Sequence, residues 1–183
     1  MSKPVIATAS LAGCFGCHMS LLDIDERILK LIELVEFNKS PVDDIKHFTK
    51  HCDVGIIEGG CCNSENVEVL KDFRKHCKIL VSVGECAIMG GLPAMRNGIS
   101  VKECLEEAYF NGVTVRGNND GNILPNDDEL PMILDKVYSL HEIVKIDYFL
   151  PGCPPTADLI WEALVSLATG KEMELSYDMI KYD

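Results

Sequence analysis

Short apolar segments rich in β-branched residues alternate with longer segments of helical periodicity along this chain, and this alternation constrains its fold more than any other feature. Three segments are apolar at successive positions, as in strands that are covered on both faces of a parallel sheet: residues 5–9, 53–57 and 79–83. Residues 34–37 and 146–150 are weaker strand candidates. The pattern predicts an α/β fold built from βαβ units.

Helix start and stop signals fall between and after these strands. Capping residues, a first-turn proline, first-turn acids and terminal glycines predict helices over residues 40–52, 63–77, 100–111 and 156–170. The first would begin at Ser40 and bury an apolar stripe that ends at Cys52. The last is apolar around most of its circumference, so it either contacts another subunit or is buried in the domain's own core.

The composition excludes several classes of partner. The chain has 183 residues, about the size of one domain, with 17 Lys and Arg against 29 Asp and Glu and a formal net charge of −12. A general binder of nucleic acid or of anionic membranes would be repelled at this charge, so we expect neither partner. The sequence has no apolar run long enough to cross a membrane and no secretion signal, so we expect a cytoplasmic protein.

Nine cysteines are the unusual part of this composition. An odd number in a reducing compartment favours metal ligation by some of them over a disulfide framework. Three fall on the predicted inward faces of helices, where a free cysteine behaves as a small hydrophobic residue. We therefore expect packing roles for Cys52, Cys77 and Cys104.

Four of the other cysteines follow predicted strands, on turns that contain glycine. Cys14 and Cys17 form a Cys-x-x-Cys motif after the first strand, and Cys86 and Cys153 each follow a later strand. Because parallel strands bring their carboxyl ends to one edge of a sheet, these thiolates can converge although they are distant in sequence. Four convergent thiolates fit either zinc or an iron–sulfur cluster.

The spacing of these cysteines favours the cluster. Structural zinc sites usually consist of two close cysteine pairs, whereas here one pair is joined by two single, distant cysteines. A proline also follows Cys153, as it does beside some cluster ligands. The Cys-x-x-Cys motif alone would also fit a redox dithiol, but a thioredoxin-like dithiol would sit at the start of a helix and need no further cysteines.

Four motifs resemble the small subunit of nickel-iron hydrogenases, most closely the cytosolic branch linked to NAD(P). They are GCFGCHMSLLDID at residues 13–25, EGGCCNSEN at 58–66, GECAIMGGLPAMRN at 84–97 and PGCPP at 151–155. The combination of CFGCHMSLLD with LPAMRN is specific, and the motifs extend over nearly the whole chain. The resemblance implies a flavodoxin-like, doubly wound parallel sheet with a cluster at the carboxyl edge of its strands. The implied domain covers residues 1–170, and a C-terminal tail covers 171–183.

The resemblance also implies one 4Fe-4S cluster, close to a nickel-iron centre that a separate large subunit holds. Carried over motif by motif, the cluster ligands would be Cys14, Cys17, Cys86 and Cys153. The chain would then be the electron-transfer subunit of a hydrogen dehydrogenase, with no catalytic residue of its own. Electrons from hydrogen would pass through this cluster to iron–sulfur and flavin subunits that reduce NAD(P), with ferredoxin as a further candidate acceptor.

Cys61 and Cys62 depart from the family pattern, in which small aliphatic residues more often follow the Glu-Gly motif. A related subunit of respiratory complex I binds its cluster with an adjacent cysteine pair, but there the pair replaces the N-terminal Cys-x-x-Cys motif that this chain retains. We expect Cys61 and Cys62 to be bystanders near the cluster, and the alternatives are a swapped ligand set or an additional redox site. Two alternative functions stay open: the cluster subunit of a complex-I-like quinone reductase, and a zinc-stabilised binding module.

Four polar residues beside these motifs have open roles. Glu58 ends a predicted strand next to the proposed cluster and could serve proton passage or hydrogen-bond a ligand loop. His18 could ligate metal, but beside four thiolates we expect it to donate a hydrogen bond to sulfur or to a neighbouring subunit instead. Arg96 and Asn97 could anchor a carboxylate of a partner subunit.

Overall fold

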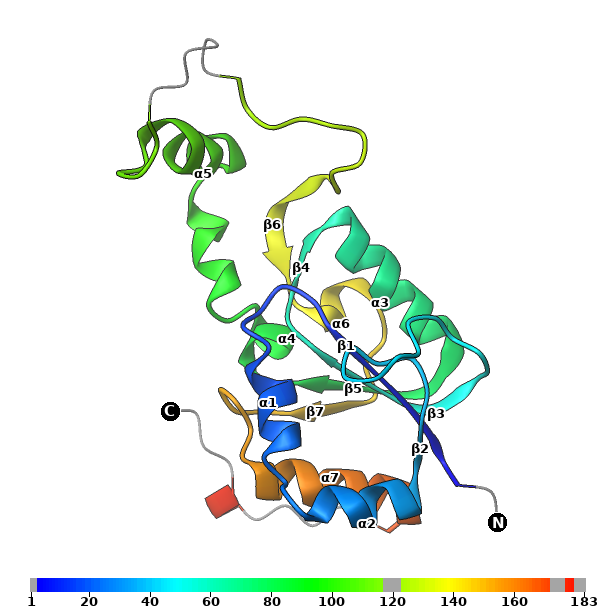
Figure 1. Ribbon diagram of the computed structural model, residues 1–183. Coiled ribbons are helices and arrows are strands. Elements are labelled where there is room, and N and C mark those ends of the chain that lie inside the picture. The colour runs from blue at the N-terminus through cyan, green and yellow to red at the C-terminus, as the bar shows by residue number, and fades with distance from the viewer. Residues whose placement is uncertain (1–2, 117–122, 172–176, 180–183) are drawn as a thin grey trace.

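The predicted strands form one parallel sheet in the computed structural model, which describes residues 3–116, 123–171 and 177–179 (Figure 1). Its five strands are β1 (Val5–Ser10), β2 (Glu36–Phe37), β3 (Cys52–Glu58), β5 (Cys77–Val83) and β7 (Tyr148–Leu150). The strand order is β2-β1-β3-β5-β7, and every neighbouring pair is parallel. Numbered along the chain within this sheet, that is the flavodoxin-like order 2-1-3-4-5, so the expected doubly wound α/β fold is confirmed.

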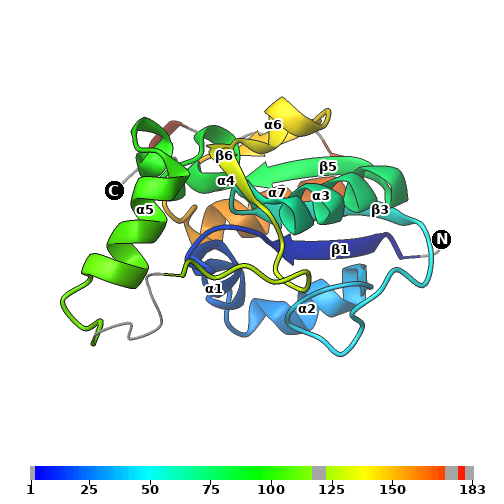
Figure 2. The same cartoon turned by 90° about the horizontal axis from the view of Figure 1, so that it is seen from above.

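Helices cover both faces of the sheet (Figures 1 and 2). One face packs against α3 (Ser64–His76) and α6 (Leu140–Ile143), and the other against α1 (Gly16–Leu22), α2 (Arg27–Leu34) and α7 (Ala157–Thr169). Alternate side chains of a strand point to opposite faces, so Leu80 of β5 packs on the α3 side and Val81 on the α7 side. Because helices cover both faces of the sheet, segments that are distant in sequence can meet at the loops along the carboxyl edge of the strands.

Phe73 of α3 is the largest fully buried side chain, with 0% of its surface exposed, and its ring lies edge-on to that of Phe48 at 4.9 Å between centroids. Replacing Phe73 with Ala should lower the free energy of unfolding by about 3–5 kcal/mol, because the truncation removes buried apolar area and leaves a cavity. Urea unfolding of anaerobically purified protein, followed by circular dichroism, measures this loss. Tyr109→Ala, at a half-exposed aromatic side chain, is the control. An equal loss in both variants would contradict the assignment of Phe73 to the core.

The helix predicted over residues 40–52 is wrong, because this segment is an irregular loop up to the start of β3. Its polar side chains bond to nearby groups instead of capping a helix. Ser40 Oγ lies 2.7 Å from Thr8 Oγ1 on β1, and Asp43 Oδ1 accepts the amide hydrogen of Ile45 at 2.7 Å. Side-chain bonds of this kind compete with helix formation, and here the tertiary bond to β1 adds to them.

The helix predicted over residues 100–111 is present but not buried. It consists of α5 (Val101–Glu106) and a π-helical turn, η2 (Glu107–Asn111), and Ser100 caps it by accepting the amide hydrogen of Glu103 at 3.1 Å. None of its residues is buried, so the expected inward face, with Cys104, is wrong. This segment stands away from the sheet, so it has no sheet surface to cover (Figure 2).

The other two predicted helices are α3 and α7, capped as expected by the side chains of Asn63 and Thr156. In α7 the buried side chains pack on the sheet and on α1: Leu159, Ile160, Ala163 and Leu164. Of the two expectations for this apolar helix, burial in the protein's own core is therefore confirmed.

Several short elements, most of them near the carboxyl edge, were not predicted. They are α1, α2, α4 (Glu85–Met89), the 3-10 helix η1 (Pro93–Gly98), and the strands β4 (Cys61–Asn63) and β6 (Ile133–Tyr138), which pair antiparallel outside the main sheet. A search of the described residues finds no helix with the length and apolar character needed to cross a bilayer. Of the predicted tail, the structure describes Lys171 and the short helix η3 (Tyr177–Met179), and the domain boundary at residue 170 stays a prediction.

Candidate metal centre

A cavity of about 80 Å³ at the carboxyl edge of the sheet is bordered by Cys14, Cys17, Cys86 and Cys153. The loop after β1 and the first turn of α1 supply the first two cysteines, α4 supplies Cys86, and the loop after β7 supplies Cys153. Parallel strands end at the same edge of the sheet, which is why segments so distant in sequence meet here. The structure thus brings together the four cysteines that the sequence singled out.

Glycines leave room for these thiols. A Cβ atom at Gly16 would lie 3.1 Å from Sγ of Cys14, and a Cβ atom at Gly91 would lie 2.9 Å from Sγ of Cys86. At Gly84 a Cβ atom would clash with Sγ of Cys17, and the backbone there has a φ of +80°, which side chains other than glycine rarely adopt. The backbone is therefore shaped to bring sulfur atoms close to it at three separate turns.

The size of the cavity fits a group of several atoms better than a single ion. Within residues 3–116, 123–171 and 177–179, no group of three or more His, Cys, Asp or Glu side chains is placed to hold one metal ion. Yet four thiols border a volume several times the roughly 10–15 Å³ that one water-sized sphere requires. Thiolates spread around such a space suit an iron–sulfur cluster, whereas zinc needs all its sulfur ligands at about 2.3 Å.

Burial disfavours the thiolate form of two of these thiols in the absence of a metal group. Burial raises the pKa of Cys17 far above its ordinary value, and the charge of Glu58 acts in the same direction. Burial also raises the pKa of Cys86. Cys17 does lie in the first turn of a helix, as a thioredoxin-like motif would, but Cys86 and Cys153 border the same cavity, and a redox dithiol needs no further cysteines. A metal group would offset these effects, since its positive charge favours the thiolate form of its ligands.

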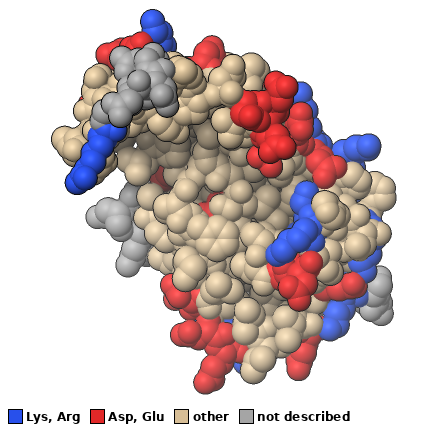
Figure 3. Space-filling model, turned by 45° about the horizontal axis from the view of Figure 1, so that its top comes forward, with Lys and Arg blue, Asp and Glu red and all other residues tan. Residues whose placement is uncertain are grey.

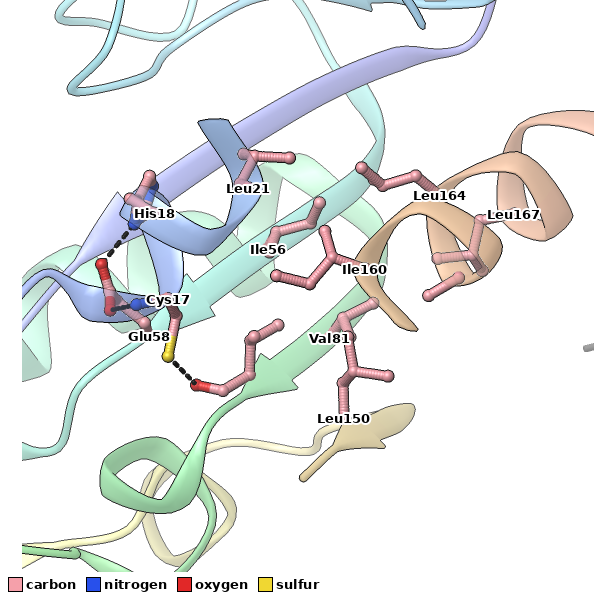
Figure 4. Close-up of a pocket in the computed structure, with 12 residues that line it drawn as sticks. Cys17, His18, Leu21, Ile56, Glu58, Val81, Leu150, Ile160, Leu164 and Leu167 are labelled. Carbon is pink, nitrogen blue, oxygen red and sulfur yellow. Dashed lines mark hydrogen bonds and ion pairs between the residues drawn. The ribbon is translucent and has the colours of Figure 1, made fainter. Parts of the chain in front are cut away.

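Glu58, at the end of β3, also borders the cavity and is only 3% exposed. Its Oε2 accepts the amide hydrogen of Cys17 at 3.0 Å, and its Oε1 is paired with Nδ1 of His18 (Figure 4). Burial alone would raise the pKa of Glu58, but the hydrogen bond and charge of His18 and the amide of Cys17 hold it below its usual value. Of the two roles expected for Glu58, it therefore hydrogen-bonds a ligand loop.

His18 is held on its other side as well, and it does not border the cavity of the four thiols. Its Nε2 lies 2.9 Å from Oγ1 of Thr8, and its ring stacks on that of Phe15 at 4.7 Å between centroids. Phe15 has a φ of 66°, in the left-handed region, so this stack accompanies a sharp turn between Cys14 and Cys17. Both ring nitrogens of His18 are thus bonded within the protein, to Glu58 and Thr8, in place of the expected bond to sulfur or to a neighbouring subunit.

Sequence reasoning missed Thr8 and Phe15 as members of this site. Thr8 is a polar residue within an otherwise apolar strand, and it is 1% exposed, so the break in the apolar run was the available signal. Nothing in the sequence indicated that Phe15 would stack on His18, because that contact depends on the left-handed turn.

Cys61 and Cys62 do not border the cavity. Cys61 is fully buried in the core on the α3 side, where burial raises its pKa to about 12. Sγ of Cys62 lies 3.3 Å from Oδ1 of Asn66. These positions agree with the bystander role expected for the pair and give no support to a ligand set that uses it.

Cys52 and Cys77 are buried and lie in register on neighbouring strands, so their packing role is confirmed, although both belong to strands and not to helices. Cys104, by contrast, is half-buried on α5.

Arg96 and Asn97 make their contacts within the chain. The guanidinium of Arg96 donates to the carbonyl oxygen of Leu134 at 2.9 Å, and Asn97 exchanges hydrogen bonds with the backbone of Val137 at 2.7 and 2.9 Å. These bonds satisfy the backbone of β6 and hold it beside η1, and a contact of either residue with a partner's carboxylate stays a prediction.

Comparison with known families and proteins finds close similarity. The family model described as "NADH ubiquinone oxidoreductase, 20 Kd subunit" matches residues 14–167. The delta subunit of the NAD-reducing hydrogenase HoxS of Cupriavidus necator is 46% identical over 181 residues, which are 99% of this chain and 86% of that protein. A subunit of the F420-non-reducing hydrogenase of Methanothermobacter thermautotrophicus is 40% identical over 175 residues. That match covers 94% of this chain but only 56% of the methanogen protein.

Solved structures agree with these sequence matches. A chain in the crystal structure of an NAD+-reducing [NiFe]-hydrogenase in its H2-reduced state has a TM-score of 0.93 and 51% identity, with 100% of both chains covered. A chain of the [NiFeSe]-hydrogenase of Dm. baculatum has a TM-score of 0.60 at 15% identity over 98% of this chain and 70% of that one. The second match shows a shared fold alone.

Proposed function

Because this chain belongs to the family of the NADH ubiquinone oxidoreductase 20 kDa subunit, we propose that it is the electron-transfer small subunit of a nickel-iron hydrogenase that reduces NAD(P). The observation that carries the proposal is the convergence of four cysteines from three separate segments on one cavity. The hydrogenase relatives favour this function over a complex-I-like quinone reductase.

One 4Fe-4S cluster in this cavity, held by Cys14, Cys17, Cys86 and Cys153, is the cofactor that we propose. Several thiols around a multi-atom space and three glycine cradles at the sulfur atoms support it. When bound, such a cluster supplies one-electron transfer. The chain's own contribution is to place the thiols and to orient the Cys17 turn through Glu58.

The proposed partner that delivers electrons is a large subunit with the nickel-iron centre. The elements that carry the cysteines also expose apolar side chains, namely Met19 on α1, Met89 on α4, and Leu92 and Met95 just beyond it, which are 51–74% exposed. Figure 3 shows a hollowed face with few charged side chains across its middle and with charges gathered toward its margins. An exposed apolar area around a redox site fits a protein interface, because it buries the cofactor when the partner docks.

Electrons would leave toward iron–sulfur and flavin subunits of an NAD(P)-reducing module, in the cytoplasm. The NAD-reducing relatives support this part of the proposal. The test is to isolate the protein from its host anaerobically, with the subunits that accompany it, and to measure hydrogen-dependent reduction of NAD and NADP. A colourless chain that contains one zinc and no iron would overturn the proposal.

Charge introduced into the apolar surface should break the proposed interface. The double variant Leu92→Glu, Met95→Glu should lose most of the co-purifying large subunit, because two buried carboxylates cannot be accommodated in an apolar contact. Affinity purification of the tagged chain, with quantification of nickel, measures the loss. Leu29→Glu is the matched control, since Leu29 is 61% exposed on α2, which carries none of the four cysteines. Equal nickel recovery from the double variant and the control would contradict the proposed interface.

A further inference from the structure

We propose that Glu58 lowers the reduction potential of the cluster that the four cysteines would hold, by fixing a buried negative charge and the Cys17 amide at the cavity wall. This inference rests on the proposed function and extends it to a residue that is not a ligand. In this role Glu58 is a positioning residue, since it acts on the cluster through Cys17 and through its charge.

The position of Glu58 is fixed from both sides. It is 3% exposed, and each carboxylate oxygen has a separate partner, the amide of Cys17 at 3.0 Å and Nδ1 of His18. His18 is fixed in turn by Thr8 at 2.9 Å, and Oγ1 of Thr8 lies 2.7 Å from Oγ of Ser40. All four side chains are buried, so the carboxylate cannot rotate away from Cys17 without breaking a buried hydrogen bond.

The charge of Glu58 has no basic side chain opposite it across the cavity. The residues that border the cavity are cysteines, glycines, one proline and the two acids Glu58 and Glu85, without Lys, Arg or His. His18 is paired with Oε1 of Glu58 and does not itself border the cavity. An anion in a buried wall acts on a neighbouring group more strongly than an exposed one, because less water screens it, although its pairing with His18 reduces this effect.

Glu58 then has two effects on the reduction potential of the cluster, and both lower it. Reduction adds a negative charge to the cluster, which a fixed carboxylate nearby disfavours. The Cys17 amide donates to Glu58, so it is not free to donate to sulfur, and hydrogen bonds to sulfur are among the factors that set a cluster's potential. Removal of the charge should therefore make the cluster easier to reduce.

The test compares Glu58→Gln with wild type in the full-length chain, purified anaerobically, by iron analysis and by a redox titration followed by electron paramagnetic resonance. Glutamine keeps an acceptor for the Cys17 amide and removes the charge. E58Q should retain its iron, and its midpoint potential should shift to a more positive value. Glu58→Asp keeps the charge but draws it back from Cys17, so its shift should have the same sign and be smaller.

Glu85→Gln is the matched control. Glu85 borders the same cavity but is only half-buried, and its nearest backbone donor, the amide of Gly152, is 3.4 Å away. Its better-solvated charge should matter less, so E85Q should shift the potential by less than E58Q. A purely structural role for Glu58 would cost iron or stability and leave the potential of the remaining cluster unchanged.

The outcomes separate the two proposals. Wild-type protein without iron would overturn the proposed function itself. A wild-type cluster whose potential is unchanged or more negative in E58Q, or that moves as far in E85Q, would overturn the inference about Glu58. If E58Q does not fold or hold iron, E58D decides: a positive shift supports the inference, and an unchanged potential overturns it.

Discussion

Anaerobically purified Cys86→Ser protein should lose most of its iron and its broad visible absorption, while the wild type should contain about four irons per chain if one 4Fe-4S cluster is bound. Cys86 is a single cysteine on α4, opposite the Cys14 and Cys17 turn, and the only cysteine that β5 and α4 bring to the cavity. A serine hydroxyl is a much weaker ligand for iron than a thiolate, so one quarter of the coordination would be lost. Iron and sulfide analysis measures the result.

Cys62→Ser is the control that separates this ligand set from the alternative. Cys62 is half-buried, like Cys86, but it lies on β4 with its thiol against Asn66. C62S should keep its full iron content. If C62S lost the iron and C86S kept it, the adjacent cysteine pair would be the true ligand pair, and the complex-I-like alternative would replace the proposed ligand set.

Gly84→Ala should also remove most of the cluster, although it changes no ligand. The added Cβ atom would clash with Sγ of Cys17, and alanine at a φ of +80° is strained by about 1–3 kcal/mol. Both effects push the Cys17 thiol out of position or distort the turn that carries Cys86 two residues later. The measurement is again iron content, together with the unfolding transition of the iron-free protein.

Gly98→Ala is the matched control, because a Cβ atom there would meet nothing within 4 Å and Gly98 has no positive φ. G98A should keep both iron and stability. If G84A retained its full iron content, the absence of a side chain at Gly84 beside Cys17 would not be needed for cluster binding. One of the observations that support a cluster in this cavity would then be contradicted.

The fold followed from the sequence where the signal was local and repeated. The three apolar segments became β1, β3 and β5, each extended by one or two residues, because strands buried on both faces need apolar side chains at every position. The helix caps at Asn63, Ser100 and Thr156 were also found, since a cap depends on side-chain and backbone groups within one turn.

Prediction failed where distant contacts outweighed local preference. The capping serine and the proline after it favour a helix that starts at Ser40. The side chain of Ser40 instead hydrogen-bonds to Thr8 of β1, and the segment stays a loop. The signals around Ser100 did give a helix, but nothing in them showed that it would stand apart from the sheet with no residue buried.

By itself, the sequence determined which four cysteines could converge. The strand before each of them can be recognised from a short run of consecutive residues, and parallel strands share one carboxyl edge. Only the tertiary structure decided which other side chains lie beside these cysteines and how they are bonded. The burial of Glu58, its bond to the Cys17 amide and the chain of contacts through His18 to Thr8 join β3, α1 and β1. These contacts join residues that are 10 to 41 positions apart in the sequence. They form because the packing of the elements brings those residues together, and the order of residues alone does not show this.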